Sequence, residues 1–210
     1  MNRNDLDLGS GGPILIPPQP PRNRSLLIAA GKGDAIYVLN PEHLGGHNKA
    51  DNHQILQTLH DCGSGAYAAP AYWNGSVYYL CSGTTLKRCS VHGDGLRLEQ
   101  QANQAEPFTG DGATPTVSAN GTADAIVWAI ECHQPKTSVA ILHAYDASDI
   151  SRPELYNSNR SARDYAGRAV RFAIPTVANG RVYVGAEKEI DVYGLLPIPQ
   201  AKQSREVRPR

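Results

Sequence analysis

The feature that most constrains the fold is an Asn-Gly pair set between short, alternating apolar stretches. Residues 175–195 read PTVANGRVYVGAEKEIDVYGL, with Asn179-Gly180 between two such stretches. Both central residues of a type I′ hairpin turn need positive φ, which Asn and Gly adopt at the lowest cost. The stretch therefore predicts a β-hairpin that is followed, after a polar turn, by a third strand.

The same phrase recurs along the chain. It begins at Pro70 as PAYWNGSVYYL and at Pro115 as PTVSANGT, and a looser copy begins at Pro13 as PILIP. These prolines and Pro175 lie about 45 to 60 residues apart, and repeats of roughly 40 to 50 residues with about four short strands are typical of β-propeller blades. The sequence predicts an all-β chain of about four blade-like, four-stranded antiparallel repeats, forming either a whole or a partial propeller.

The repeats also set the predicted boundaries. Residues 1–12 form a lead-in and residues 198–210 form a polar, basic tail that we expect to be disordered. The predicted blades lie near 13–60, 70–100, 115–159 and 175–197. The fourth strand of a blade has the weakest pattern, and its best candidates are 55–59, 96–98 and 155–158. The run PPQPP at 17–21 is expected to interrupt the first blade as a surface loop, because proline cannot serve a central strand.

The blade phrases at 70–91, 115–146 and 175–195, with AGKGDAIYVLN at 30–40 as a weaker partner, resemble the PQQ-like (quinoprotein-type) β-propeller repeat family. The resemblance covers about residues 8–197. Within it, the phrases DLGSGGP, GATPTVSANG and LYNSN are similar to the C-terminal part of secreted bacterial PQQ-like repeat proteins. It implies a propeller, whereas many members of the family bind no quinone. The family's alcohol dehydrogenases resemble one another in an adjacent Cys-Cys pair near the quinone, and this sequence has no such pair.

Two functions from different classes are compatible with the sequence. One is a non-catalytic binding or scaffold propeller for a protein or glycan partner, either as a module of its own or as a fragment of a longer propeller. The other is a PQQ-dependent dehydrogenase or part of one, which needs a general base, Ca²⁺ ligands and stacking groups around the quinone. The candidates by residue type are the acids Asp111, Asp164 and Glu131 and the stacking residues Trp73 and Trp128. Both tryptophans occupy repeat positions typical of core residues, so the site residues give PQQ and Ca²⁺ no support and we favour the binding module.

The best candidate for a ligand or partner surface is a charged cluster ahead of the last blade. It consists of Arg160, Arg163, Asp164, Arg168 and Arg171. Arginine binds carboxylates and phosphates bidentately, and an insertion in a propeller lies on one face, where binding sites form. The alternative is a solvated loop with no ligand.

Candidates for metal binding are weaker. Asp94 and Asp111 each lie between two glycines and would bind calcium if they converged with carbonyl oxygens, although Asp-Gly more often marks a turn. His43 and His47 would form a zinc pair on one face of a helix. Two glycines between them disfavour that helix, so we expect a polar loop.

The cysteines Cys62, Cys81, Cys89 and Cys132 form no CxxC motif. Cys81 and Cys89 flank a turn, so that a disulfide across a hairpin and two buried thiols are both compatible with the sequence. The cysteine count does not settle the compartment. A fragment of a longer precursor would be secreted or periplasmic, whereas a complete chain would be cytoplasmic, because the first twelve residues lack an apolar signal segment.

The charge balance, the lack of long apolar runs and the alternative of an open stack of blades each indicate which partners to expect. The chain has 20 basic and 20 acidic residues, which gives no electrostatic argument for nucleic acid as a partner. No apolar run approaches the roughly 20 residues needed to cross a bilayer, so no membrane span is predicted. An open stack of blades would leave one face of a sheet exposed and available for association.

Overall fold

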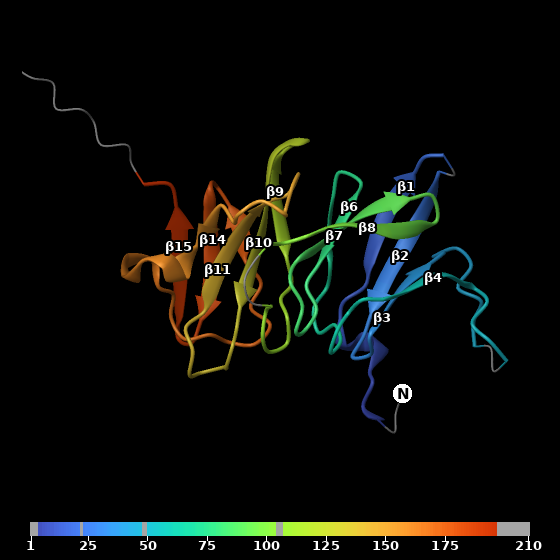
Figure 1. Ribbon diagram of the computed structural model, residues 1–210, viewed down its shortest axis with the longest axis horizontal. Helices are drawn as coiled ribbons and strands as arrows, with labels where there is room; N and C mark the ends of the chain where they lie inside the picture. The colour runs from blue at the N-terminus through green and yellow to red at the C-terminus, as the bar shows by residue number, and fades with distance from the viewer. Residues whose placement is uncertain (1–3, 22, 48–49, 104–106, 197–210) are drawn as a thin grey trace, which may run out of the picture.

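The structure is a computed structural model that describes residues 4–21, 23–47, 50–103 and 107–196. The described residues form short β-strands and the single-turn 3-10 helices η2 (Leu8–Ser10), η3 (Ser158–Arg160) and η4 (Ala162–Asp164). The strands build four antiparallel sheets that stand side by side in a row (Figure 1). The predicted all-β chain of four antiparallel repeats is confirmed, and the row is open at both ends. The predicted tail at 198–210 lies outside the described residues.

Each sheet is built from consecutive strands, so that neighbours in the chain are neighbours in the sheet. The first sheet contains β1 (Ile14–Gln19), β2 (Arg24–Ala30), β3 (Ala35–Leu39) and β4 (Ile55–His60). The second contains β5 (Ala71–Trp73), β6 (Ser76–Tyr79), β7 (Lys87–His92) and β8 (Gly95–Gln101). The third contains β9 (Thr116–Asn120), β10 (Ala123–Glu131), β11 (Ile141–Asp146) and β12 (Tyr156–Asn157). The fourth contains β13 (Thr176–Ala178), β14 (Arg181–Ala186) and β15 (Glu189–Gly194), and thus has three strands among the described residues where the other sheets have four.

The candidates for a fourth strand are confirmed. The segments predicted at 55–59, 96–98 and 155–158 form β4, β8 and β12. The last of these is a strand for two residues only.

The Asn-Gly turns adopt the predicted geometry in two sheets. Asn74-Gly75 has φ values of 45° and 76°, and Asn179-Gly180 has 51° and 70°, as a type I′ turn requires. In the third sheet Asn120 stays in β9 and pairs with Ala123. The turn there is Gly121-Thr122, in which glycine takes the positive φ of 62° and the β-branched threonine avoids it.

The run at 17–21 is expected to form a loop, and that prediction is wrong for Pro17 and Pro18 but confirmed for Pro20 and Pro21, which lie in the turn after β1. β1 continues through Pro17 and Pro18 to Gln19. β1 lies at the edge of its sheet, and its pairing with β2 shifts register between Ile16 and Gln19. Proline is tolerated in edge strands and at bulges, because the missing N–H is not needed for the ladder there.

Three apolar clusters fill the spaces between consecutive sheets. The first joins Ile28 of β2 to Val77 of β6, and the second joins Tyr78 of β6 to Val127 of β10. The third contains Val182 and Val184 of β14, with Trp128 packed against it. Each sheet in the middle of the row thus buries both faces, as stacked repeats require. Among the described residues no helix is long and apolar enough to cross a bilayer.

Candidate functional site

A groove of about 670 Å³ lies between the third and fourth sheets. Most of the residues that line it are aromatic or aliphatic: Ile126, Trp128, Leu155, Tyr156, Val177, Val182, Val192, Tyr193, Leu195 and Leu196. Pockets that hold small ligands or short segments typically enclose about 300–1,000 Å³ and have mostly apolar walls with a few polar groups. The groove therefore has the size and chemistry of a binding site.

Local sequence explains why the two sheets leave this space. The outer strand of the third sheet, β12, is only two residues long, so it covers little of the six-residue β15 opposite. On the other wall Gly180 and Gly194 contribute no side chain. These glycines leave part of the space between the two sheets unfilled.

The polar groups at the groove are already paired with one another. The guanidinium of Arg163 binds both carboxylate oxygens of Asp164, at 2.6 and 2.9 Å. The Tyr193 hydroxyl donates to the backbone carbonyl of Asp164 at 3.0 Å, and Trp128 Nε1 donates to Ser118 Oγ at 2.8 Å. The hydrogen bond from Arg163 holds the pKa of Asp164 below its usual value. The groove therefore offers apolar contact and shape more than unpaired donors and acceptors.

Two tyrosines stand edge to face at the groove. The rings of Tyr156 and Tyr193 are 6.1 Å apart in a T-shaped arrangement. Burial raises the pKa of both phenols, so they remain neutral at physiological pH. T-shaped aromatic pairs are favourable, so this contact helps to hold the two walls of the groove together.

The groove also borders an unpaired sheet edge. Among the described residues β15 pairs with β14 alone, and no strand lies on its other side. Val192, Tyr193 and Gly194 of this edge strand line the groove. An edge strand presents backbone N–H and C=O groups to which an extended segment can be added.

Of the predicted charged cluster, only Arg163 and Asp164 line this groove. The structure ties the other arginines to different places. Arg160 pairs with Glu154 at 3.1 Å, Arg171 pairs with Asp111 at 3.3 Å, and the backbone of the exposed Arg168 bridges to Val139. The cluster is thus spread out, and its paired arginines are neutralised by carboxylates of this chain.

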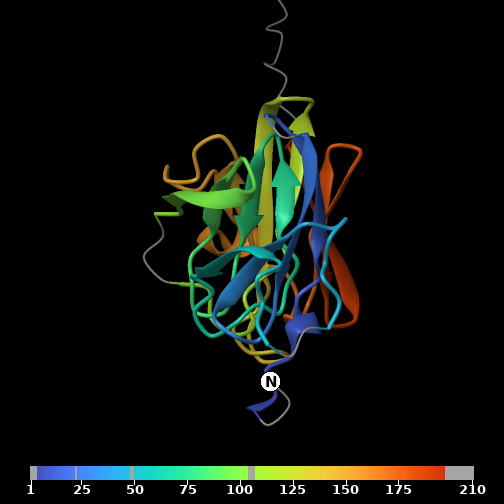
Figure 2. The same ribbon diagram turned by 90° about the vertical axis from the view of Figure 1, so that its right-hand side faces the viewer.

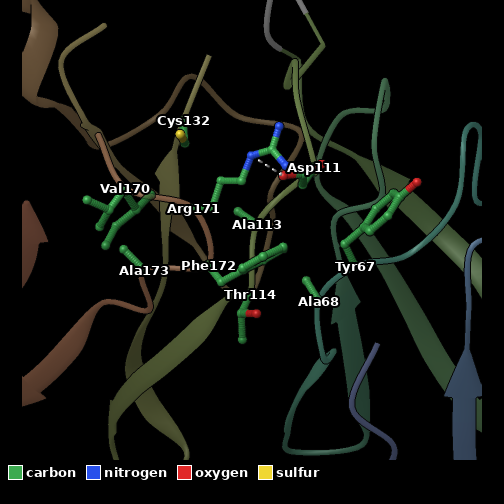
Figure 3. A pocket seen from close by; sticks show the side chains of 12 residues that line it. Tyr67, Ala68, Asp111, Ala113, Thr114, Cys132, Val170, Arg171, Phe172 and Ala173 are labelled. Atoms are coloured by element: carbon green, nitrogen blue, oxygen red, sulfur yellow. Dashed lines mark ion pairs between the residues drawn. The ribbon is translucent and has the colours of Figure 1, made fainter. Parts of the chain in front are cut away.

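The Asp111–Arg171 pair lines a separate, small cavity beside Cys132 and Phe172 (Figure 3). Its volume of about 20 Å³ is room for about one water molecule. The other metal candidate, Asp94, lies in the turn between β7 and β8 and is 3.5 Å from Arg24. Each aspartate is therefore bound to its own arginine, and the structure does not bring the two together. In the described part of the chain no three His, Cys, Asp or Glu residues form a group that would hold a metal.

The predicted histidine loop has no helix at 41–47. His43 Nδ1 lies 3.1 Å from Asn40 Nδ2, so the ring caps a local turn. His47 is exposed. The expected polar loop is confirmed for these residues.

Glu131, a candidate general base, belongs instead to a buried ionic cluster. His143 is clamped between two carboxylates, with Nε2 3.2 Å from Glu131 and Nδ1 2.9 Å from Glu154. Burial opposes protonation of His143, but the hydrogen bonds to both carboxylates outweigh it and raise its pKa. Burial likewise opposes ionisation of Glu131 and Glu154, and the hydrogen bond to His143 lowers their pKa nevertheless. The three groups pair their charges and hydrogen bonds with one another, so their role here is to stabilise the fold.

The residues named for quinone chemistry do not form one site. Asp111, Asp164 and Glu131 bind three different partners, Arg171, Arg163 and His143. Trp73 packs against the cluster between the second and third sheets and Trp128 against the cluster between the third and fourth. No base, cation ligands and stacking pair converge here, so these residues do not fit PQQ with Ca²⁺.

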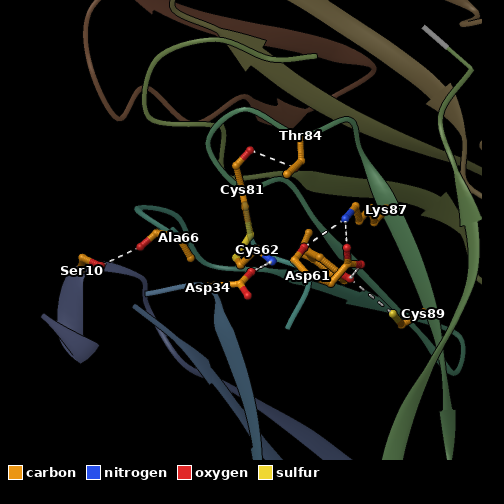
Figure 4. The surroundings of a disulfide bond; sticks show 10 residues. Ser10, Asp34, Asp61, Cys62, Ala66, Cys81, Thr84, Lys87 and Cys89 are labelled. Atoms are coloured by element: carbon orange, nitrogen blue, oxygen red, sulfur yellow. Dashed lines mark hydrogen bonds and ion pairs between the residues drawn. A yellow bond between two sulfur atoms is a disulfide. The ribbon is translucent and has the colours of Figure 1, made fainter. Parts of the chain in front are cut away.

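The structure pairs the cysteines in a way that differs from both alternatives left open by the sequence for Cys81 and Cys89. Cys62 and Cys81 form a disulfide with Cα atoms 5.2 Å apart (Figure 4). Cys89 lies opposite Val77 in the β6–β7 ladder, so Cys81, beyond the end of β6, does not face it. Cys89 is a buried free thiol, and Cys132 is free and half-buried. Neither alternative holds for the pair, because Cys81 bonds to Cys62 and only Cys89 is a buried thiol.

A polar cluster lies beside this disulfide (Figure 4). The buried ammonium of Lys87 binds a carboxylate oxygen of Asp61 and, at 3.0 Å, its backbone carbonyl. The Tyr79 hydroxyl donates to the other carboxylate oxygen at 2.9 Å. Burial raises the pKa of the Cys89 thiol next to Tyr79 to about 11. These groups satisfy one another within the first sheet-to-sheet junction and leave no nucleophile exposed.

No protein family model matches the chain, and no curated protein matches it. Two solved structures of computationally designed proteins share its fold. Ika8 has a TM-score of 0.54 and 13% identity, over 81% of this chain and 43% of Ika8. Ika4 has a TM-score of 0.52 and 12% identity, over 81% of this chain and 85% of Ika4. The chain thus spans less than half the length of Ika8, and at such identities the likeness concerns the fold alone.

Apart from Arg163 and Asp164, the residues that line the groove are not predicted as site residues by the sequence. Trp128 was noted as a stacking candidate and assigned to the core, and it is both a core residue and a groove wall. The sequence pattern around Tyr156, Tyr193 and Leu155 is that of ordinary strand residues. The one available signal was the short pattern of the third sheet's last strand, which leaves the facing sheet uncovered.

Proposed function

We propose that the four sheets are blades of a β-propeller of the PQQ-like type and that the chain is a non-catalytic binding module. Its ligand is an extended, apolar segment of a partner protein, bound in the groove between the third and fourth sheets. The observation that carries the proposal is the groove itself, with about 670 Å³ enclosed by mainly apolar walls.

The chemistry of the walls favours a peptide over a glycan. A sugar presents many hydroxyl groups that need partners, whereas Trp128 Nε1 and the Arg163–Asp164 pair are already engaged within the chain. An extended peptide would place alternate apolar side chains against the walls and pair its backbone with the free edge of β15. Both halves of that recognition are adjacent, because β15 lines the groove.

A peptide library displayed on phage and selected against the whole chain tests this proposal. We expect enriched sequences with apolar residues at alternate positions. Their affinity should fall at least tenfold for Leu155→Asp, which places a charge on an exposed groove wall. The matched control is Leu98→Asp on β8, another exposed leucine, which should bind as the wild type does.

Two results would overturn the proposal. One is equal binding of the selected peptides to Leu155→Asp and to the wild type. The other is calcium-dependent, stoichiometric binding of PQQ in a calorimetric titration, which would favour the dehydrogenase alternative and make a dehydrogenase assay the next step. We expect no heat of binding from PQQ with or without Ca²⁺.

A further inference from the structure

One contact is repeated at every junction in the row of sheets. Each sheet has a residue that pairs with the first residue of its first strand: Ile28, Tyr78, Trp128 and Tyr183 in the four sheets. The residue just before it points to the opposite face of the sheet, and these residues are Leu27, Val77, Val127 and Val182. The four sheets can therefore be compared position by position.

At each junction, the residue that pairs with the start of the first strand packs in one cluster with a residue of the next sheet. That second residue occupies the position just before the corresponding residue in its own sheet. Ile28 shares a buried cluster with Val77, and Tyr78 shares the next one with Val127. Trp128 packs against the third cluster, which contains Val182. The burial is complete in the middle of the row, where Tyr78, Val77 and Val127 have no exposed surface.

At the two ends of the row, one residue of this contact is present and the sheet that would supply the other is not, among the described residues. Tyr183 of the last sheet points away from the third sheet, and Leu27 of the first sheet points away from the second. The two sheets lie at opposite ends of the row in Figure 1, and Figure 2 looks onto the end formed by the first sheet. At the junctions inside the row, a face like the end face of the last sheet thus packs on a face like the end face of the first sheet.

Both end faces are apolar around these positions. On the first sheet Leu15, Leu27 and Leu39 form one row across β1, β2 and β3, and Leu15 is 61% exposed. On the last sheet Tyr183 pairs with Val192, and Ile190 on the same face is 69% exposed. Exposed apolar faces of this kind mark interaction surfaces.

The segments ahead of the sheets repeat a backbone hydrogen bond to the preceding sheet, and the segment ahead of the first sheet differs. Ala66, ahead of the second sheet, donates its N–H to Gly31 in a turn of the first sheet, and Ala113, ahead of the third sheet, donates to Leu80 of the second. Ala169, ahead of the fourth sheet, donates to Ser138 of the third. The segment ahead of the first sheet bonds to that sheet's own turn, through Lys32 N–H and Asp7 O. It has no preceding sheet among the described residues.

From this repetition we infer that the last sheet of one copy packs on the first sheet of a second copy, with Tyr183 against the partner copy's Leu27. Two such contacts close a ring of eight sheets. The contact joins different faces of the two copies, so it is heterologous and closes only if the rotation between copies allows it. We assign a second copy to each end face for one reason. The residue position that covers such a face at every inner junction lies, in this chain, on the opposite end of the row.

The mass of the whole chain in solution, measured by light scattering after size exclusion, tests the inference. We expect twice the mass of the single chain for the wild type. Leu15→Asp and Ile190→Asp each alter one end face at an exposed position and should each give the single-chain mass. Leu98→Asp, an exposed leucine on neither end face, should remain a dimer, and circular dichroism checks that all variants are folded.

Mixing the two variants separates a head-to-tail contact from a symmetric one. A mixture of Leu15→Asp and Ile190→Asp retains one intact contact, so it should contain at least tenfold more dimer than either variant alone. A wild type with the single-chain mass would overturn the inference, and so would open polymers or a mixture with no gain in dimer. One variant that stays a normal dimer would indicate a face paired with itself and would also overturn it.

A photo-crosslinking residue in place of Tyr183 identifies the occupant directly. The expected product has the mass of two chains, with the link mapped to β2 or β3. A link between two copies of β14, or a link only to other proteins, would contradict the assignment.

Discussion

At the scale of single residues, the buried ion pairs decide how stability depends on conditions. His143 and its two carboxylates, and Lys87 with Asp61, are charged groups taken out of water at junctions between sheets. A buried charge is tolerated when its partner stays in place, and it becomes costly when the partner is removed or neutralised. Both clusters therefore predict measurable effects.

The His143 cluster predicts a stability maximum at weakly acidic pH. The pKa of His143 is raised, so its contribution is present below the usual histidine value and is lost as pH rises through the raised pKa. The pKa values of Glu131 and Glu154 are lowered, so their contribution is present above the usual value and is lost as pH falls through the lowered pKa. Urea unfolding across the pH range should show both declines. His143→Gln should abolish the alkaline one, and an unchanged alkaline slope in that variant would contradict the assignment.

Removing the partner of Lys87 should be costly. Asp61→Ala leaves the ammonium buried without its carboxylate, and we expect a loss of about 3 kcal/mol in the free energy of unfolding. The double variant Asp61→Ala with Lys87→Met should recover much of that loss, because no charge remains buried. Arg97→Ala, which breaks an exposed ion pair with Glu99, is the control and should cost much less. Equal losses in Asp61→Ala and the double variant would be inconsistent with a buried charge as the cause.

The two free thiols should differ in reactivity. Burial raises the pKa of both thiols, that of Cys89 to about 11, but it hides only Cys89 from solvent, whereas Cys132 is half-buried. Iodoacetamide should therefore modify Cys132 in the folded protein and Cys89 only after unfolding. Mass spectrometry of timed samples measures both rates, and comparable native rates would disprove the burial of Cys89.

At the scale of elements, the junction between the first and second sheets has a covalent link that the others lack among the described residues. The Cys62–Cys81 bridge connects the segment after β4 to the turn after β6, across 19 residues. Disulfides persist mainly in oxidising compartments, so the bridge favours the secreted or periplasmic alternative over the cytoplasmic one.

Loss of the bridge should lower stability by about 3 kcal/mol, because a closed loop of this size restricts the unfolded chain. The double variant Cys62→Ala with Cys81→Ala measures this by denaturant unfolding. Cys132→Ala is the control and should cost much less, since that thiol is free and half-buried. A double variant as stable as the wild type would mean that the bridge does not form.

At the scale of the whole molecule, an open row of sheets leaves two apolar faces in water. If a second copy covers them, the folded state is linked to association, and the unfolding temperature should rise with protein concentration. Thermal scans of the wild type over about a hundredfold range of concentration test this. Ile190→Asp should unfold at one temperature throughout that range, and a wild type without any shift would argue against association.

The order and kind of the strands followed from the sequence itself. Asn-Gly pairs force positive φ, and short alternating stretches have one face to bury, so hairpins and antiparallel sheets were predictable from neighbours in the chain. The prolines at 17 and 18 were misread because their tolerance depends on β1 being an edge strand, which is a property of the assembled sheet.

Only the tertiary structure decided which residues meet across sheets. Cys62 reaches Cys81, and Trp128 forms a groove wall with Tyr193, because sheets stack and stacking brings together residues far apart in the sequence. The charged cluster at 160–171 shows the converse, since residues close in sequence were carried to separate carboxylates. Local conformational preference fixes the strands, while contacts between sheets depend on register and packing that no single repeat contains.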